Sequence, residues 1–145
     1  MTAYRGECLC GSIAFSLTGA LPKLYRCHCS LCRKQSGAEA NAAILIRAEN
    51  FRWLQGESEI SCYQRASGFT SHFCRQCGSP VPNPLAILPD YWWVPAGLLP
   101  ADLPSNIVSH LNTASRAGWD EHLPVDADFP EMPGNIQEFL KLLES

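Results

Sequence analysis

The chain has 145 residues, of which 46% are hydrophobic and 17% charged, and its formal net charge is -3. This length supports one compact core that buries about two-thirds of the unfolded surface, so we expect a single domain over residues 1–145. The longest run of Lys or Arg is the pair Arg33-Lys34, so the basic patch of a nucleic-acid-binding protein is missing and we expect no nucleic-acid partner.

The first half of the chain predicts strands around one short helix. Apolar and polar residues alternate over residues 13–18, which is typical of a half-buried strand. Residues 30–36 predict a helix of one or two turns that is capped at Ser30 and ends at Gly37. Three further strands are expected at Ala40 to Ile46, Glu59 to Gln64 and Phe69 to Phe73.

Proline dominates the next segment. Seven of the eleven prolines lie between Pro80 and Pro104, and each would remove a hydrogen-bond donor from a central strand. We therefore expect this stretch to be mostly loop and edge strand. Within it, Trp92 and Trp93 are interpreted as side chains that pack onto a sheet rather than as parts of a ligand site.

The last third predicts one strand and one helix. Residues 107–112 look like a final strand. Apolar residues then recur at helical spacing at Ile136, Phe139, Leu140 and Leu143. Because Asn135 and Glu138 form a pattern similar to a capping box ahead of them, we expect an amphipathic closing helix.

The start of the chain and its apolar runs bear on where the protein resides. The chain starts MTAYRGECLCGS, without a charged segment followed by an apolar stretch, and no later run approaches the roughly 18 apolar residues that cross a bilayer. We therefore expect a cytoplasmic protein without a membrane segment.

In a reducing compartment, clustered cysteines hold metal more often than they form disulfides. The eight cysteines of the chain therefore point to metal.

Two cysteine pairs predict a closed zinc site. Cys8 and Cys10 are two residues apart, so on an extended strand their sulfur atoms point to the same side. Cys74 and Cys77 form a Cys-x-x-Cys pair followed by Gly78, which permits a tight turn. Four thiolates make the tetrahedral set of a structural zinc. A redox disulfide is the alternative, and spacing leaves open whether Cys8 and Cys10 instead join the middle cluster.

That middle cluster, Cys27, Cys29 and Cys32, offers three thiolates at a strand end and a first helical turn. Three protein ligands would leave a fourth zinc position open, as in catalytic sites. The alternatives are a second structural zinc completed by His28 or a distant residue, or an empty site prone to oxidation. His28 lies between two ligands and is expected to face away from the metal.

The remaining cysteine and two histidines have ordinary interpretations. Cys62 has no close cysteine neighbour and is expected to pack in the core. His72 and His110 are interpreted as histidines with ordinary hydrogen-bond partners.

Four motifs together carry a family resemblance. They are Gly6-Glu7-Cys8-Leu9-Cys10-Gly11, Cys27-His28-Cys29-Ser30-Leu31-Cys32-Arg33, Phe73-Cys74-Arg75-Gln76-Cys77-Gly78-Ser79 and His110-x-x-x-x-Ser115-Arg116-Ala117-x-Trp119. In this order they resemble the glutathione-dependent formaldehyde-activating enzyme family, which also includes centromere protein V. The resemblance covers nearly the whole chain, although this chain is shorter than the type member.

The resemblance implies a mainly β, single-domain, tent-like fold of antiparallel sheets with short helices, held by zinc. It also implies two zinc ions. Cys8, Cys10, Cys74 and Cys77 would bind the structural ion, and Cys27, Cys29 and Cys32 a second, open and partly occupied one.

The implied activity is that of a carbon-sulfur lyase working in reverse, which joins glutathione or another small thiol to formaldehyde or a related aldehyde. Arg33 and Lys34 are candidates for steering the glutathione carboxylates, with solvated surface charge as the alternative. No motif supplies a convincing general acid or base. The competing hypothesis is therefore a non-catalytic zinc module that binds a thiol, a metal or a protein partner.

Overall fold

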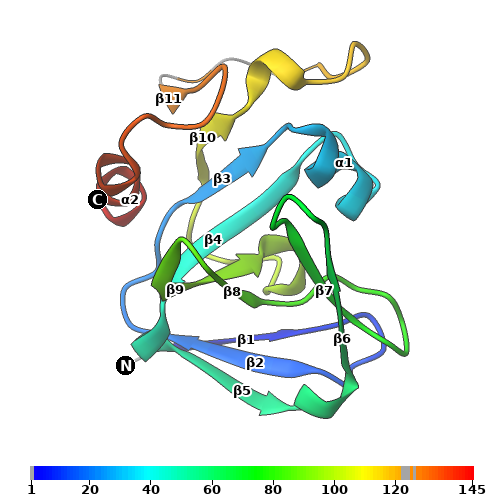
Figure 1. Cartoon of the computed structure of the whole chain (residues 1–145). Coiled ribbons are helices and arrows are strands. Elements are labelled where there is room, and N and C mark those ends of the chain that lie inside the picture. The colour runs from blue at the N-terminus through cyan, green and yellow to red at the C-terminus, as the bar shows by residue number, and fades with distance from the viewer. Residues whose placement is uncertain (1, 122–124, 126) are drawn as a thin grey trace.

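A computed structural model describes residues 2–121, 125 and 127–145 of the chain. It is built mainly from β-strands, as expected (Figure 1). The strands are β1 (Ala3–Glu7), β2 (Ala14–Thr18), β3 (Leu24–Cys27), β4 (Asn41–Arg47), β5 (Phe51–Gln55), β6 (Ile60–Gln64), β7 (Thr70–Cys74), β8 (Asn83–Leu85), β9 (Leu88–Pro95), β10 (Ile107–Leu111) and β11 (Ala127–Asp128). The helices are α1 (Ser30–Ser36) and α2 (Ile136–Glu144), and short 3-10 turns lie at Ala48–Asn50, Glu57–Glu59, Ala96–Leu98 and Thr113–Ser115.

The strands form three sheets. A three-stranded sheet has the order β1-β2-β5, a six-stranded sheet the order β11-β10-β3-β4-β9-β8, and β6 and β7 form a hairpin of their own. The larger sheet is mixed rather than purely antiparallel, because β10 runs parallel to both β3 and β11. In Figure 1 the small sheet lies at one end of the molecule, and β10 and β11 lie at the other.

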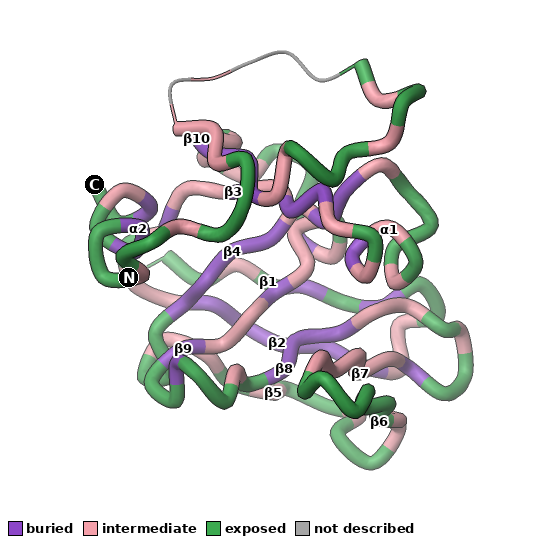
Figure 2. Tube along the Cα trace, turned by 45° about the horizontal axis from the view of Figure 1, so that its top comes forward, coloured by how far each residue is buried: buried purple, intermediate pink, exposed green. Residues whose placement is uncertain are grey.

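The strand over residues 14–18 is buried on both faces, whereas the alternating pattern predicted a half-buried one. Ala14, Phe15 and Leu17 are fully buried and Ser16 nearly so. Figure 2 shows β2 and β4 as the most continuously buried strands. On the neighbouring strand β1, Gly6 lies directly opposite Phe15, and a side chain at Gly6 would collide with the Phe15 ring. The alternation therefore identified the strand but understated its burial.

The proline-rich segment contains a central strand, contrary to the expectation of mostly loop and edge. β9 lies between β4 and β8 inside the six-stranded sheet. Its prolines, Pro89 and Pro95, fall near its start and at its end, and Pro84 lies on the edge strand β8. The positions between them keep their backbone donors, so the sheet tolerates the prolines. Trp92 packs against the core as expected, with its ring stacked on Phe51 at a centroid distance of 4.3 Å. Trp93 also packs partly against the core, but contrary to expectation it lines a cavity.

The closing helix forms where the sequence predicted it. The Asn135 side chain accepts hydrogen bonds from the backbone N–H groups of Gln137 and Glu138, which caps the first turn of α2. Phe139, Leu140 and Leu143 are buried in a core cluster that also contains Cys27 and Cys32. The strand Ile107–Leu111 also forms, but it is not the last, because β11 follows it.

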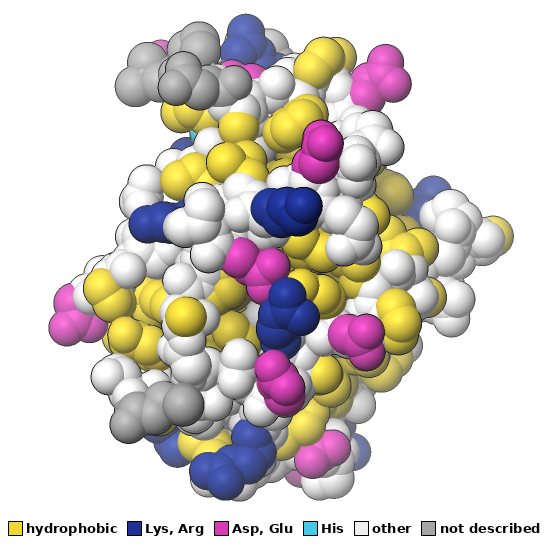
Figure 3. All heavy atoms as spheres, turned by 90° about the vertical axis from the view of Figure 1, so that its left-hand side faces the viewer, with side chains coloured by type: hydrophobic (Ala, Val, Ile, Leu, Met, Phe, Trp, Pro, Cys, Tyr) yellow, Lys and Arg dark blue, Asp and Glu magenta, His cyan; other side chains and the backbone are white. Residues whose placement is uncertain are grey.

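The described residues contain no helix long and apolar enough to span a bilayer. On the face shown in Figure 3, Lys and Arg side chains alternate with Asp and Glu. Charges of one sign do not gather into a large patch on that face.

Candidate metal centres and substrate cavity

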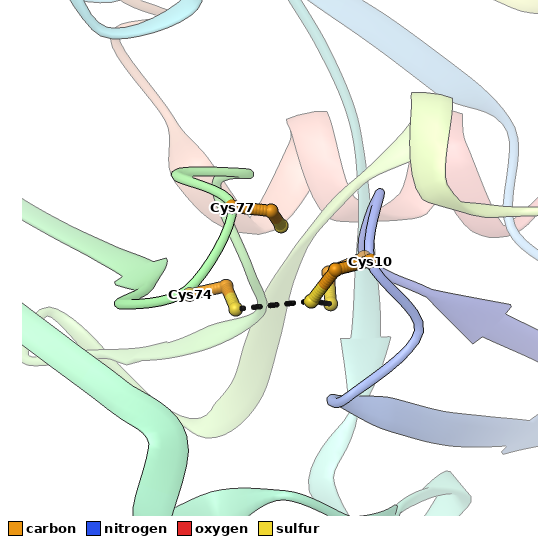
Figure 4. Close-up of side chains that lie close together, drawn as sticks. Cys10, Cys74 and Cys77 are labelled. Carbon is orange, nitrogen blue, oxygen red and sulfur yellow. Dashed lines mark hydrogen bonds between the residues drawn. The ribbon is translucent and has the colours of Figure 1, made fainter.

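The two cysteine pairs that lie far apart in sequence meet in space. The sulfur atoms of Cys8, Cys10, Cys74 and Cys77 all lie within 4.8 Å of one another. Figure 4 shows Cys10 and Cys74 facing each other, with a sulfur to sulfur distance of 3.8 Å, and Cys77 beside them. The first pair follows the end of β1 in a turn, not on a strand as predicted, and the second begins at the last residue of β7.

Each pair is followed by the same two residues, Gly-Ser. Gly11 and Gly78 both have φ of +80°, and their backbone N–H groups donate to the carbonyls of Cys8 and Cys74. Glycine adopts this left-handed conformation without strain, which lets both turns fold back on their cysteines. The expectation of a tight turn at Gly78 is confirmed.

The two serines hold the cluster together. Ser12 Oγ lies 3.1 Å from Cys10 Sγ and 3.4 Å from Cys74 Sγ, so it contacts both pairs. Ser79 Oγ accepts the Leu9 backbone N–H at 3.0 Å and lies 3.4 Å from Cys77 Sγ. The hydrogen bond with Ser79 lowers the pKa of Cys77 to about 6, which favours the thiolate form that a metal binds.

The middle cysteines also converge. The sulfur atoms of Cys27, Cys29 and Cys32 lie within 4.8 Å of one another. Cys27 ends β3, Cys29 is the N-cap of α1 and Cys32 lies in its first turn. Cys29, rather than the predicted Ser30, caps the helix, because its sulfur accepts the Cys32 backbone N–H at 3.3 Å.

The three thiols of the triad influence one another's pKa. Hydrogen bonds with the thiols of Cys27 and Cys32 hold the pKa of Cys29 far below its ordinary value, and the same contacts raise the pKa of Cys32. Cys27 Sγ also accepts a hydrogen bond from Asn112 Nδ2 at 3.2 Å. Both cysteine clusters therefore fit a soft divalent metal such as zinc, four sulfur atoms in one and three in the other.

The segment after β10 supports the triad from outside. His28 is buried, with Nδ1 2.8 Å from Asp120 Oδ2 and Nε2 2.7 Å from His110 Nδ1. Its ring is thus engaged with these two residues, and the three border a cavity of about 550 Å³. Arg33 Nη1 donates to the backbone carbonyls of His28 and Ser115. This guanidinium ties the segment to the triad, and its role in substrate binding stays a prediction.

Two other cavities lie around α1. The larger, of about 770 Å³, is bordered by Cys32 together with Gln35, Phe69, His72 and Trp93. Burial lowers the pKa of His72. The smaller, of about 400 Å³, shares Gln35 and Phe69 with it and is also lined by Lys34. The triad therefore borders a cavity large enough for a small ligand.

One sequence-based interpretation is wrong. Cys62 is exposed rather than packed in the core, because β6 pairs only with β7 in a separate hairpin. An outward-facing residue of such a hairpin has no covering layer.

Comparison with known proteins agrees with the geometry. Residues 3–112 match the family described as glutathione-dependent formaldehyde-activating enzyme. The chain belongs to this family.

Two individual proteins are similar to the chain. A curated protein of Halomonas elongata, named provisionally as a glutathione-dependent formaldehyde-activating enzyme, is 35% identical over 81 residues. This match spans 52% of the chain and only 52% of that relative. The crystal structure of a Rhodobacter sphaeroides protein superimposes with a TM-score of 0.56 at 25% identity, covering 71% of the chain and 98% of that protein.

Proposed function

We propose that the protein is a zinc-dependent carbon-sulfur lyase working in the direction of synthesis, similar to an S-(hydroxymethyl)glutathione synthase. It would join glutathione, or another small thiol, to formaldehyde or a related aldehyde in the cytoplasm. One observation carries the proposal: the three-cysteine cluster borders a ligand-sized cavity through Cys32. The family match supports the thiol and the aldehyde as substrates.

The two cysteine clusters would have different roles. Cys8, Cys10, Cys74 and Cys77 would hold a structural zinc, and Cys27, Cys29 and Cys32 a second one with an open position. A zinc ion bound there would supply a Lewis acid that favours a thiolate at neutral pH.

The chain would position the two reactants. In the reaction the thiol sulfur forms a bond to the carbonyl carbon, the carbon-oxygen π bond breaks, and the thiol proton moves to the oxygen. Gln35 and Asn83 line the cavity. Asn83 Nδ2 already donates to Thr70 Oγ1 and the Pro84 carbonyl, whereas among the described residues Gln35 Nε2 donates only to Ser71 Oγ, so its second N–H can donate to the carbonyl oxygen of the aldehyde. Holding the two reactants side by side, the aldehyde in this cavity and the glutathione carboxylates near Lys34 and Arg65 in the adjoining one, raises their effective concentration, which is the main source of acceleration that these residues can offer.

The test is exchange spectroscopy of formaldehyde and glutathione, with and without zinc-loaded protein. We expect exchange at least about tenfold faster with protein. The Cys29→Ser variant should keep the fold by circular dichroism, lose one of two zinc ions by mass spectrometry and lose the acceleration. Cys62→Ser is the matched control, since Cys62 is exposed and belongs to neither cluster, and it should behave as the parent protein.

One observation favours a second candidate, a non-catalytic zinc module that binds a thiol, a metal or a protein partner. Among the described residues that line the cavity beside Cys32, none is Asp or Glu, which leaves the His72 imidazole as the one candidate general base there. Saturable thiol binding with an unchanged exchange rate would select this module over the enzyme.

A further inference from the structure

The cavity beside the triad is much larger than formaldehyde requires. Its volume of about 770 Å³ falls within the range of roughly 300 to 1,000 Å³ that is typical of sites for drug-sized ligands. Formaldehyde, the smallest aldehyde, would leave most of this space to water. The size therefore points to a substrate with a longer body.

Part of the cavity lining is apolar. Phe69, Leu85, Ile87 and Trp93 line it, and Ile87 leaves 76% of its surface exposed in the loop between β8 and β9. A single exposed Ile is common on protein surfaces. Here it lines the same cavity as Cys32, so a ligand that covers it would remove hydrophobic surface from water.

The same cavity has no charged wall. None of its described lining residues is Asp, Glu, Lys or Arg, and its polar groups are amides, hydroxyls and one imidazole. A carboxylate placed in it would lose water without gaining a cationic partner, at a large cost in free energy. Lys34 and Arg65 line the smaller cavity that shares Gln35 and Phe69 with it, so the carboxylates of a charged substrate have a better place there.

We propose that the cavity beside Cys32 selects an uncharged aldehyde with an aliphatic body. This inference rests on the proposed function and names the class of its carbonyl substrate. The aliphatic chain lies along Leu85, Ile87 and Trp93, and the carbonyl carbon lies towards Cys32. The same bonds change as in the reaction of formaldehyde: a carbon-sulfur bond forms, the carbonyl π bond breaks, and the thiol proton goes to oxygen. No oxidant or reductant is needed.

The experiment compares aldehydes at constant glutathione on the zinc-loaded protein. Exchange spectroscopy gives kcat/KM for formaldehyde, propanal, pentanal and the carboxylated aldehyde glyoxylate. We expect kcat/KM, corrected for the uncatalysed rate, to rise about fourfold for each methylene group that becomes buried, and to be lowest for glyoxylate. Equal values, or a maximum at formaldehyde, would overturn the inference while leaving the proposed function intact.

Substitution at the rim tests the site itself. Ile87→Arg should lower kcat/KM for pentanal about tenfold and raise it for glyoxylate, because it adds a cation to an uncharged wall. Leu54→Arg is the matched control, since Leu54 is also an exposed aliphatic residue but lies on β5 and lines none of the three cavities. An equal effect of both variants would contradict the assignment.

A binding measurement separates the inference from the proposed function. Pentanol, which cannot react, should bind saturably and shift the Trp93 indole resonance, more weakly in Ile87→Arg. If the protein accelerates the reaction of no aldehyde, the proposed function fails. The pentanol titration then tests the apolar ligand site on its own. Saturation supports the site, and a response that never saturates overturns it.

Discussion

Ser79 sets the acid-base behaviour of the cysteine beside it. The ordinary pKa of Cys77 is 9.0, and in the folded chain it is about 6. The lowered pKa contributes stability and metal affinity that are fully present above pH 9 and are lost as the pH falls through 6. Protons therefore displace a metal from this cluster only under acidic conditions.

We predict that Ser79→Ala makes the protein release zinc at higher pH. Without the hydroxyl, the pKa of Cys77 rises towards its ordinary value, so the midpoint of zinc release should move upward by roughly half a pH unit. Zinc release is followed with a chromogenic chelator during acid titration. Ser58→Ala, at an exposed serine outside the cluster, should leave the midpoint unchanged, and a midpoint that Ser79→Ala fails to move would rule out the role of the hydroxyl.

Asn112 supports the other cluster through one hydrogen bond to Cys27. Its φ of 57° makes it the one non-glycine residue in the described chain with a positive φ, and its amide lies 3.2 Å from the sulfur. Asparagine tolerates this conformation better than most residues.

We expect Asn112→Gly to weaken zinc binding by the triad about 10- to 100-fold, the usual cost of losing a partner that orients a metal ligand. Glycine keeps the backbone conformation, so the change reports the amide alone. A competition titration measures the affinity, with Asn106→Gly at an exposed asparagine as control. Unchanged affinity in Asn112→Gly would show that the hydrogen bond does not tune the cluster.

Helix α2 connects the end of the chain to the triad. Phe139 is 2% exposed, and its ring meets Tyr25 edge-on at a centroid distance of 5.4 Å. Tyr25 lies on β3, two residues before Cys27. The helix therefore covers the strand that ends in the three-cysteine cluster.

Phe139→Ala should lower the free energy of unfolding by about 3 to 5 kcal/mol, because it leaves a cavity under the helix. Urea denaturation measures the change. Leu142→Ala, on the same helix but only partly buried, should cost distinctly less. Equal losses would mean that α2 is not held by the Phe139 contact.

The elements show where sequence reasoning succeeds. The helices over residues 30–36 and 136–144 were predictable, because caps and apolar spacing are local features. β9 was not, because proline counts do not reveal that Pro89 and Pro95 fall at the two ends of one strand. The burial of β2 and the exposure of Cys62 were missed for a related reason, since both depend on which sheet covers which strand.

In the candidate site too, local features were predictable and long-range contacts were not. Spacing alone grouped the cysteines into pairs and a triad, but left the pairing across the chain open. The supporting serines do have a usable pattern, the repeated Cys-Gly-Ser at residues 10–12 and 77–79. Asn112, Asp120 and the cavity have no such pattern, because their contacts to residues 27–33 span long stretches of chain.

For the whole molecule, the four-cysteine cluster joins two separate sheets. Cys8 and Cys10 follow β1 of the three-stranded sheet, and Cys74 ends β7 of the hairpin. Zinc binding in small domains contributes roughly 10 to 16 kcal/mol, which is comparable to the entire stability of a typical domain. A metal at this position would therefore decide whether the sheets stay together.

We predict that complete chelation of zinc abolishes cooperative thermal unfolding. Circular dichroism follows the fold while a chelator removes the metal. Cys74→Ser should resemble the chelated protein, and Cys29→Ser should still unfold cooperatively with one zinc bound. A sharp transition in metal-free protein would show that the four-cysteine cluster does not hold the fold.

The separation of the cysteines along the chain also orders events during translation. Residues 27–32 leave the ribosome as one short piece, so the triad can capture a metal ion locally. The other cluster must wait for Cys77, and at about 5 to 20 residues per second that delay lasts seconds. Asn112 emerges later still. The newborn chain therefore makes its three clustered thiols before Asn112, the residue that contacts Cys27, so a metal ion that these thiols bind would reach them while the protein is still unfinished.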